Sequence, residues 1–556
     1  MRKIYFCIFI LSLFIGLPGY AAAETFFIDP EMDLSGRSEI EAELKISGTK
    51  NQIYAEKEFF DNLAVQDQER LLGIITNLSK EFDLNIYPKL REVFGEERSP
   101  GIDNDPKIFI LMHSTKQGIG GYVRDRDAYS KNQFADSNTR ELIYLDIDQA
   151  FNSPLGPAFL AHEFQHLITF NQKTIIKGVT EERWLNEARS EYAPTILGYN
   201  NTWSGSYLQK RTNEFLAHPS DAIMDWRGRS KDHASVNLFI HFLVDKYGVP
   251  ILKEMTGSDA TGGESIERAI AKLGGTETLR GVFIDWAVTA YVNNATLNHG
   301  SRFQYKNPNL SFGNLHVLPS STFRIYDNNL TGMNLLIDNW SAQWHRFTPG
   351  SLGEETTLHI RINSKDADSL IVPYVTNDFF GGTTVNFFDL SKGSVLSIPD
   401  FGTVVSSVVV IPTLILPGEQ NQSISSAFSL EGFISNTFAE RFAEGALVRA
   451  EGDPRVYIIK NGLNPTATFI RWIQTPELFG FYKHFKWTDI IQVKPVFLSD
   501  FEESFLIRRA GDYRIFKVDS SGKKEWLNIT AEQFEGAGYK WEMVYEVNDA
   551  EFNWYK

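Results

Sequence analysis

The pattern of hydrophobic positions predicts alternating strands and helices in the first part of the chain and mainly helices after it. Short apolar runs at 108–111 and 141–147 are typical of buried strands. Residues 56–94 carry apolar side chains three and four positions apart, which indicates amphipathic helices. The clearest later helices are predicted over 157–170, 184–197, 235–247, 265–273 and 279–292. We therefore expect an α/β part up to about residue 155 and a mostly helical part after it.

The hydrophobic pattern changes near residue 315. Short runs rich in β-branched and aromatic residues follow, and Gly, Asn, Asp and Ser separate them; 358–362, 369–375 and 404–411 are examples. Closely spaced strands of this kind are typical of a β-sandwich. We expect an all-β, sandwich-like domain over residues 315–437.

The last segment, residues 438–556, contains an internal repeat. Four residues of its first half recur in the same order in its second half: Trp472, Phe479, Trp487 and Val493 return as Trp526, Phe534, Trp541 and Val547. The repeat predicts two small β-rich modules in tandem, at about 440–500 and 501–556. The repeated aromatic residues form either the core of each module or a surface that stacks on sugars or partner proteins. A cell-surface or glycan ligand for these modules is therefore a hypothesis.

The first 23 residues have the features of a secretory signal peptide. Arg2 and Lys3 precede the apolar run 4–17, and three alanines end at Ala23. We expect a bacterial protein that is secreted, in the medium, at the cell surface or in the periplasm. The alternative is an uncleaved N-terminal anchor, although the apolar run is short for a membrane span. The later sequence predicts no membrane span, and the only cysteine, Cys7, lies in the leader, so no disulfide is expected.

The overall composition is that of a globular protein with an acidic surface. Hydrophobic residues make up 42% and charged residues 22% of the chain, and the formal net charge is −16. No segment is rich in Lys and Arg. Because nucleic-acid binding depends on a basic surface, we do not expect a nucleic-acid partner.

The strongest chemical signal is the HExxH pattern at residues 162–166. On a helix, His162 and His166 lie on the same face, where two imidazoles can bind one Zn²⁺. Glu163 between them can act as the general base toward a water molecule. The apolar flanks of the motif suit a buried helix. The alternative is a buried pair of structural histidines.

The downstream segment 184–191 offers the carboxylates that such a site lacks. Catalytic zinc usually has three protein ligands, and Glu187 lies far enough along the chain to reach His162 and His166 from a second helix. Glu191 follows one helical turn later. It can accept a hydrogen bond from the free ring nitrogen of a ligand histidine and so fix its orientation.

These motifs resemble those of the gluzincin metallopeptidases. The combination of HEFQH with NEARSE is most similar to the hyicolysin-type secreted neutral metallopeptidases, and the resemblance covers roughly residues 40–300. It implies an α+β, zincin-like catalytic domain over 24–314, one catalytic Zn²⁺, and protein or peptide substrates. The exopeptidase motif of the gluzincin aminopeptidases is missing from the sequence, which favours an endopeptidase.

The resemblance also implies roles for residues outside the two motifs. Related enzymes stabilise the oxyanion with a Tyr or His from a later helix, and His233 is our candidate; the alternative is an ordinary histidine at the start of a surface helix. Gly120, Gly121 and Tyr122 are expected on an edge strand that pairs with extended peptide, or else in a simple turn. Asp103 and its neighbours carry Ca²⁺-type oxygens but lack the other ligands of a known loop, so a turn is favoured there.

Two other functions fit the same sequence. The first is an inactive zincin-like surface or adhesion protein whose C-terminal modules bind glycan, cell wall or protein. The second is a zinc hydrolase with a non-peptide substrate or a single protein target. An unstructured protein substrate such as casein distinguishes both from a broad endopeptidase.

Overall fold

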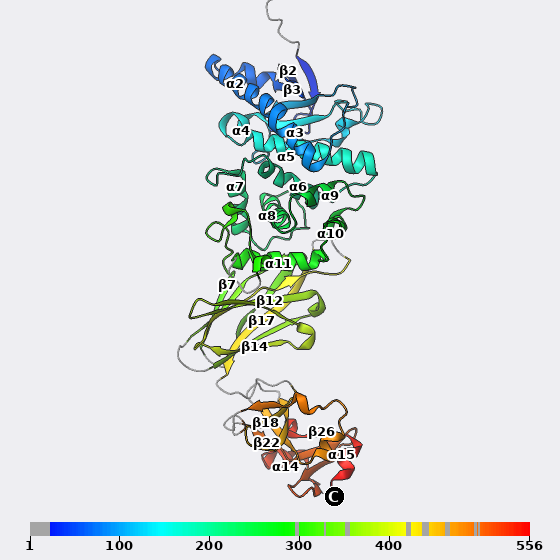
Figure 1. The fold of residues 1–556 in the computed structure, drawn as a ribbon, viewed down its shortest axis with the longest axis vertical. Coiled ribbons are helices and arrows are strands. Elements are labelled where there is room, and N and C mark those ends of the chain that lie inside the picture. Colours follow the sequence, from blue (N-terminus) through cyan, green and yellow to red (C-terminus); the bar gives the residue numbers. More distant parts are fainter. Residues whose placement is uncertain are drawn as a thin grey trace, which may run out of the picture. The chain divides into compact units, whose positions relative to one another are not determined.

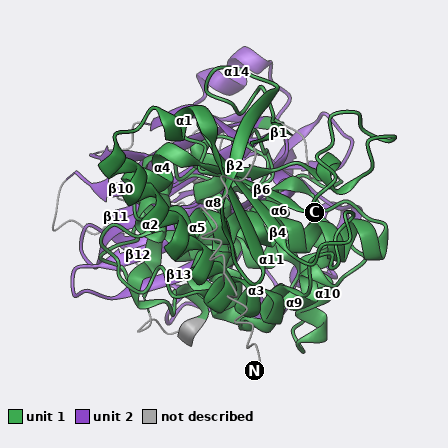
Figure 2. Ribbon diagram, turned by 90° about the horizontal axis from the view of Figure 1, so that it is seen from above, with its two compact units in different colours: residues 1–318, 338–343, 413–425 green, residues 319–337, 344–412, 426–556 purple. Residues whose placement is uncertain are grey.

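The computed structural model describes residues 23–294, 300–326, 330–350, 356–418, 424–435, 444–461, 468–493, 498 and 501–556. The predicted signal peptide, apart from Ala23, lies outside the described residues. The chain forms two compact units (Figure 2). Unit 1 consists of Met1–Leu318, Asp338–Gln343 and Thr413–Ser425, and unit 2 of the remaining residues. The expectation of a multidomain chain with a helical region and several β-sheet regions is confirmed.

Unit 1 begins with a six-stranded sheet of order β1-β2-β3-β4-β6-β5. Its strands β2 and β3 are labelled in Figure 1. Its strands are β1 (Glu24–Phe27), β2 (Glu39–Ser47), β3 (Asn51–Glu56), β4 (Ile108–His113), β5 (Gly121–Val123) and β6 (Leu142–Asp146). β3, β4 and β6 are parallel, and β4 and β6 are buried along their whole length. β5 runs antiparallel to β6 and ends the sheet.

Helices make up most of the remaining part of unit 1. They are α1 (Lys57–Asp61), α2 (Val65–Glu81), α3 (Tyr87–Phe94), α4 (Ile147–Asn152), α5 (Gly156–Thr169), α6 (Arg183–Ile196), α7 (Tyr207–Ala217), α8 (Ser230–Tyr247), α9 (Pro250–Thr256), α10 (Gly262–Lys272) and α11 (Leu279–Val292). α5 packs on β5 and β6 and against α6, and α8 packs on α6 and α7. None of the helices in the described part of the chain is both long and apolar enough to cross a membrane.

The start of α8 differs from the predicted helix 235–247. The helix begins at Ser230, where the Asp232 carboxylate caps the first turn: it accepts from the backbone N–H of Arg229 and from the Arg229 guanidinium. This cap adds a first turn that contains His233. By contrast, α5 and α6 lie within about two residues of their predicted limits, the usual disagreement between definitions of helix ends.

Unit 2 contains a mostly antiparallel sheet of order β8-β17-β11-β14-β15-β12, with β13 beside β12 and with β10 joining β15 to β7. The bounds are β7 (Ser321–Ile325), β8 (Thr331–Asp338), β10 (His345–Pro349), β11 (Thr356–Ser364), β12 (Leu370–Asp378), β13 (Thr383–Phe388), β14 (Val395–Phe401), β15 (Val405–Val410) and β17 (Ser425–Ser435). Leu358, Ile360 and Ile362 of β11 are buried, and so is His359, so this part of the strand is covered on both faces.

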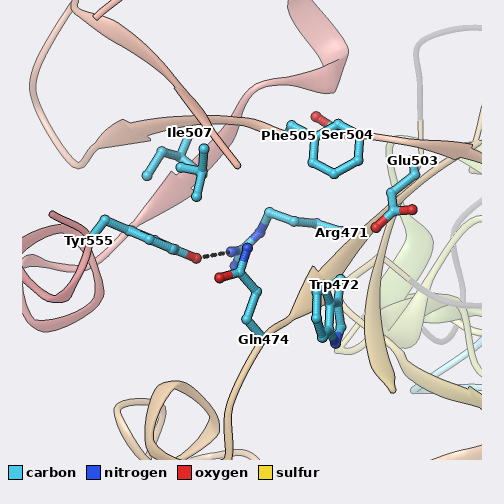
Figure 3. Close-up of a pocket in the computed structure, with 9 residues that line it drawn as sticks. Arg471, Trp472, Gln474, Glu503, Ser504, Phe505, Ile507 and Tyr555 are labelled. Carbon is cyan, nitrogen blue, oxygen red and sulfur yellow. Dashed lines mark hydrogen bonds between the residues drawn. The ribbon is translucent and has the colours of Figure 1, made fainter. Parts of the chain in front are cut away.

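The C-terminal part of unit 2 has two small sheets, of order β21-β18-β19-β20-β22 and β25-β24-β23-β26. β18 pairs antiparallel with β19 and parallel with β21, and β23 likewise pairs antiparallel with β24 and parallel with β26. Their bounds are β18 (Leu447–Ala450), β19 (Val456–Asn461), β20 (Thr468–Ile473), β21 (Ile491–Val493), β22 (Glu502–Glu503), β23 (Leu506–Arg509), β24 (Ile515–Val518), β25 (Lys524–Trp526) and β26 (Tyr545–Val547). Arg471 of the first sheet meets the Tyr555 hydroxyl near the end of the chain (Figure 3).

Candidate metal centre

Three predicted ligands converge where α5 packs against α6. His162 and His166 lie one turn apart on α5, and Glu187 reaches them from α6. The His162 Nε2 atom is 3.2 Å from His166 Nε2 and 3.2 Å from Glu187 Oε2. The third side of this triangle, from His166 Nε2 to Glu187 Oε2, measures 3.5 Å. All three side chains are almost completely buried.

The triangle has the dimensions of a zinc site. Zinc bonds of about 2.0–2.1 Å in a tetrahedron place neighbouring ligand atoms about 3.3–3.4 Å apart. The three measured edges, 3.2, 3.2 and 3.5 Å, bracket that value. Two imidazole nitrogens and one carboxylate oxygen are also the donor set of a catalytic zinc site with one open position. These residues therefore fit a zinc ion.

The buried hydroxyl of Ser190 determines that the Nδ1 atom of His166 is a hydrogen-bond donor. The Nδ1 atom of His166 lies 3.1 Å from Ser190 Oγ, and the Ser190 hydroxyl lies 2.5 Å from Gln165 Oε1 and donates to it. Since this hydroxyl donates elsewhere, its oxygen accepts from His166 Nδ1–H. The lone pair of His166 Nε2 then faces the ligand triangle. Neither Ser190 nor Gln165 was predicted from the sequence, although Ser190 stands directly before Glu191 in the same motif.

His162 has no such hydrogen bond. Its Nδ1 atom is buried and without a hydrogen-bond partner among the described residues. The nearest carboxylate oxygen, Glu191 Oε1, is 3.8 Å away, beyond hydrogen-bond range. Glu191 thus lies beside the ligand histidine, as expected, but its hydrogen bonds go to other groups.

Glu191 is fully buried and accepts hydrogen bonds from two pairs of residues that are each one helical turn apart. From α7, Arg211 donates through Nη2 at 2.5 Å and Nε at 2.9 Å, and the Tyr207 hydroxyl donates at 2.7 Å. From α8, His233 Nδ1 lies at 3.0 Å and Asn237 Nδ2 at 3.1 Å. Burial alone raises the pKa of Glu191, but Arg211 and His233 hold it well below its usual range. Glu191 is therefore a carboxylate.

His233 lies in the first turn of α8, beside the group of side chains that hydrogen-bond to Glu191. Its side chain is 23% exposed, and its ring centre is 6.1 Å from that of His162. Its Nδ1 atom is 3.8 Å from Glu187 Oε2, farther than from Glu191. The Trp226 ring meets the imidazole edge-on at 4.7 Å. The structure thus brings His233 next to the ligand triangle while leaving part of its ring accessible.

Glu163 is 6% exposed and lies beside the edge strand β5. Burial raises the pKa of its carboxyl group to about 8. A Cβ atom on Gly121 would stand 2.8 Å from Glu163 Cγ, and one on Gly120 would stand 2.4 Å from the Phe159 ring. The two glycines therefore allow β5 to approach α5 closely, and no strand of the described chain pairs with the outer edge of β5.

The side chain of Tyr122 lies on the face of β5 that is opposite to α5. Successive side chains of a strand point to opposite faces, so Tyr122 faces away from Gly121 and α5. Its buried ring stacks on Tyr144 at 4.3 Å, and its hydroxyl pairs with His113 Nε2 at 3.0 Å. The side chain therefore belongs to the core of the sheet.

The acidic residues at 103–105 form a turn, in agreement with the favoured interpretation. The Asp103 carboxylate accepts from the backbone N–H of Asp105, and the Asp105 carboxylate accepts from that of Lys107. Within the described residues, convergent His and carboxylate groups occur only around His162, so neither aspartate belongs to a candidate metal group.

Comparison with known proteins found no matching family model. The chain is 27% identical over 261 residues to the neutral metalloprotease ShpI of Staphylococcus hyicus. The similarity is to a metalloprotease. The match covers 42% of this chain and 54% of that protein, so the chain spans about half the length of the curated relative it matches.

Two solved structures each resemble about a fifth of the chain. A mitogen from Yersinia pseudotuberculosis is 16% identical and covers 19% of this chain and 85% of its own, with a TM-score of 0.15. The pre-peptidase C-terminal domain of a Bacillus anthracis collagenase is 11% identical and covers 21% of this chain and 97% of its own, with a TM-score of 0.14.

Proposed function

We propose that this chain is a secreted, zinc-dependent endopeptidase of the gluzincin type, most similar to the hyicolysin-type enzymes. The observation that carries the proposal is the ligand triangle of His162, His166 and Glu187, with edges of 3.2–3.5 Å and with Glu163 on the same helix. The similarity to a neutral metalloprotease supports it. Its substrates are proteins or peptides, and its cofactor is one Zn²⁺.

The chemistry divides between the cofactor and the chain. Bound zinc supplies a Lewis acid that activates water and polarises the scissile carbonyl. Glu163 takes the proton of the attacking water and passes it to the leaving amine, so it acts first as base and then as acid. His233 donates a hydrogen bond to the oxyanion of the tetrahedral intermediate. The substrate main chain lies along the free edge of β5, where Gly120 and Gly121 leave room for it.

The proposed domains follow the sequence boundaries. The catalytic domain covers 24–314, a sandwich-like domain covers 315–437, and two tandem modules cover 438–556. The modules serve attachment to a glycan, a cell surface or a protein, and this role does not depend on catalysis.

The test of the proposed function is a comparison of the wild-type protein with Glu163→Gln. Both proteins are expected to bind one zinc ion per chain, and casein cleavage is expected to fall by about 10²–10⁴-fold in the variant because the general base is lost. Zinc binding without cleavage in the wild type would favour the inactive adhesion protein or the narrow hydrolase. A wild type that binds no zinc would exclude the ligand assignment.

A further inference from the structure

The hydrogen bonds of Glu191 point toward His233 and not toward a zinc ligand. Five hydrogen bonds reach its carboxylate, from Arg211, Tyr207, His233 and Asn237. His162 Nδ1 is 3.8 Å from Glu191 and has no hydrogen-bond partner among the described residues. A buried carboxylate that served mainly to orient His162 would be expected at hydrogen-bond distance from it.

We propose that Glu191, held by Arg211 and Tyr207, is the positioning residue of His233. The inference rests on the proposed function, in which His233 contacts the reacting substrate. A carboxylate only accepts hydrogen bonds, so the His233 Nδ1 atom at 3.0 Å carries a hydrogen. The Nε2 atom is then the ring nitrogen that remains for the substrate, and it donates to the oxyanion in the imidazolium form, in which both ring nitrogens carry a hydrogen.

The donors from α7 explain why Glu191 does not turn toward His162. The guanidinium of Arg211 binds both carboxylate oxygens, a paired geometry that fixes the plane of the carboxylate. Tyr207 adds a second donor at Oε1, and its hydroxyl also accepts from Arg211 Nη2 at 2.7 Å. Rotation of the carboxylate would break several buried charge-assisted hydrogen bonds at once.

The α8 side of the cluster determines where the imidazole goes. Asn237, one turn after His233, donates to the other oxygen of Glu191 at 3.1 Å and so ties α8 to α6. The Asp232 cap fixes the start of the same helix. The His233 ring is 23% exposed and would otherwise be free to change rotamer. Glu191 and the edge of Trp226 restrict it from two directions.

A double-mutant cycle tests the pairing. We would measure kcat, KM and zinc Kd for wild type, Glu191→Gln, His233→Gln and the double variant. Each single change is expected to lower kcat by about 10²-fold, with KM and zinc Kd little changed, because the oxyanion donor is lost or displaced. The double variant is expected to be no slower than His233→Gln alone. A zinc affinity about 10–100-fold weaker in Glu191→Gln, with independent effects in the double variant, would overturn the proposal.

Two further variants separate positioning from general loss of structure. Tyr207→Phe removes one hydroxyl and no charge, and its smaller loss of kcat is expected to vanish in the His233→Gln background. Glu551→Gln breaks a similar buried Arg–Glu pair in the C-terminal modules, and it is expected to leave kcat and zinc Kd unchanged. A loss of kcat in Tyr207→Phe that persists without His233 would contradict the proposal.

An NMR measurement tests the pairing of Glu191 with His233 without relying on peptidase activity. In zinc-loaded protein with ¹⁵N-labelled histidine, the Nδ1–H signal of His233 is identified by its disappearance in His233→Gln. We expect that signal to shift or vanish in Glu191→Gln while the signal of His162 stays in place. A moved His162 signal with an unchanged His233 signal would refute the pairing. If the wild type binds zinc but cleaves no casein, the proposed function fails while this spectrum still decides the pairing.

Discussion

Two buried glutamates in different regions of the molecule are held by the same kinds of side chain. In the helical region, Arg211 and Tyr207 donate to Glu191, which is fully buried. One more neighbour changes what this cluster can do, because His233 also contacts Glu191 and is partly exposed to solvent.

In the C-terminal part of unit 2 the buried pair is a cross-link between two small sheets. Glu551, which is 1% exposed, accepts from Arg471 Nη1 at 2.5 Å and from the hydroxyls of Tyr482 at 2.5 Å and Tyr555 at 3.0 Å. Arg471 belongs to the first small sheet, whereas Glu551 follows the second. The pair thus connects the first small sheet to the helix that follows the second.

A buried Arg–Glu pair does not by itself indicate a functional site. Such pairs are costly to bury and contribute little net stability over an apolar replacement. Near Glu191 the additional signs are an accessible imidazole and a ligand triangle one helical turn away. Both signs must be present before a buried pair is interpreted as part of a site.

The largest expected difference between the two regions concerns zinc. Glu187→Ala removes one corner of the ligand triangle, and zinc affinity is expected to fall by more than about 100-fold, since even changes behind the ligands cost 10–100-fold. Glu551→Ala is expected to leave zinc affinity unchanged. Titration with a competing chelator measures both, and equal affinities in the two variants would contradict the ligand assignment.

The next effect compares single and paired replacements. Glu551→Ala leaves Arg471 buried and unpaired and is expected to cost about 3–5 kcal/mol of unfolding free energy, whereas Arg471→Met with Glu551→Leu is expected to restore most of it. In the helical region, Arg211→Met with Glu191→Leu is expected to remain folded but to lose about 10²-fold in kcat. Denaturant unfolding and casein cleavage are the measurements. Full activity of the second pair would remove the distinction between the regions.

A smaller effect is expected where β5 passes α5. The Cβ atom of Gly121→Ala would stand 2.8 Å from Glu163 Cγ and 2.8 Å from the Tyr144 carbonyl oxygen, so strand and helix must separate. A displacement of about 1 Å can cost about 10²-fold in rate, and we expect kcat to fall by up to that factor with zinc retained. Gly73→Ala on α2, which has open space around it, is the control. Unchanged kcat in Gly121→Ala would show that this approach is not needed.

The smallest predicted effect tests the hydroxyl behind His166. Ser190→Ala removes the acceptor of His166 Nδ1–H and is expected to weaken zinc binding by about tenfold, the lower end for such partners. Ser235→Ala is a matched control, because its hydroxyl is buried and without a hydrogen-bond partner among the described residues. Equal zinc affinities in both variants would mean that Ser190 only fills space.

The sequence was sufficient for features that depend on short-range spacing. The i,i+4 spacing of His162 and His166 on one helix, and of Glu187 and Glu191 on the next, follows from helical geometry alone. The apolar stretch around HExxH predicted α5, and Pro157 in its first turn is consistent with the helix start.

Features that depend on packing between helices could not be predicted from the sequence. Tyr207 and Arg211 on α7 have the same four-residue spacing as the motif histidines, but nothing in the sequence shows which helix face meets Glu191. For the same reason, spacing did not reveal that Glu191 hydrogen-bonds to His233 and not to His162. The sequence predicted an edge strand at Tyr122 but not the direction of its side chain, because strand alternation decides which of two neighbouring residues faces α5.

The five hydrogen bonds at Glu191 also constrain how this protein can evolve. A neutral residue in place of Glu191 leaves the buried Arg211 without a counter-ion. A neutral residue in place of Arg211 does the same to the Glu191 carboxylate. Intermediate sequences with one partner changed are therefore expected to be less fit than either end point. Across homologous chains, the positions of Glu191, Arg211, Tyr207 and His233 should change together or remain as they are.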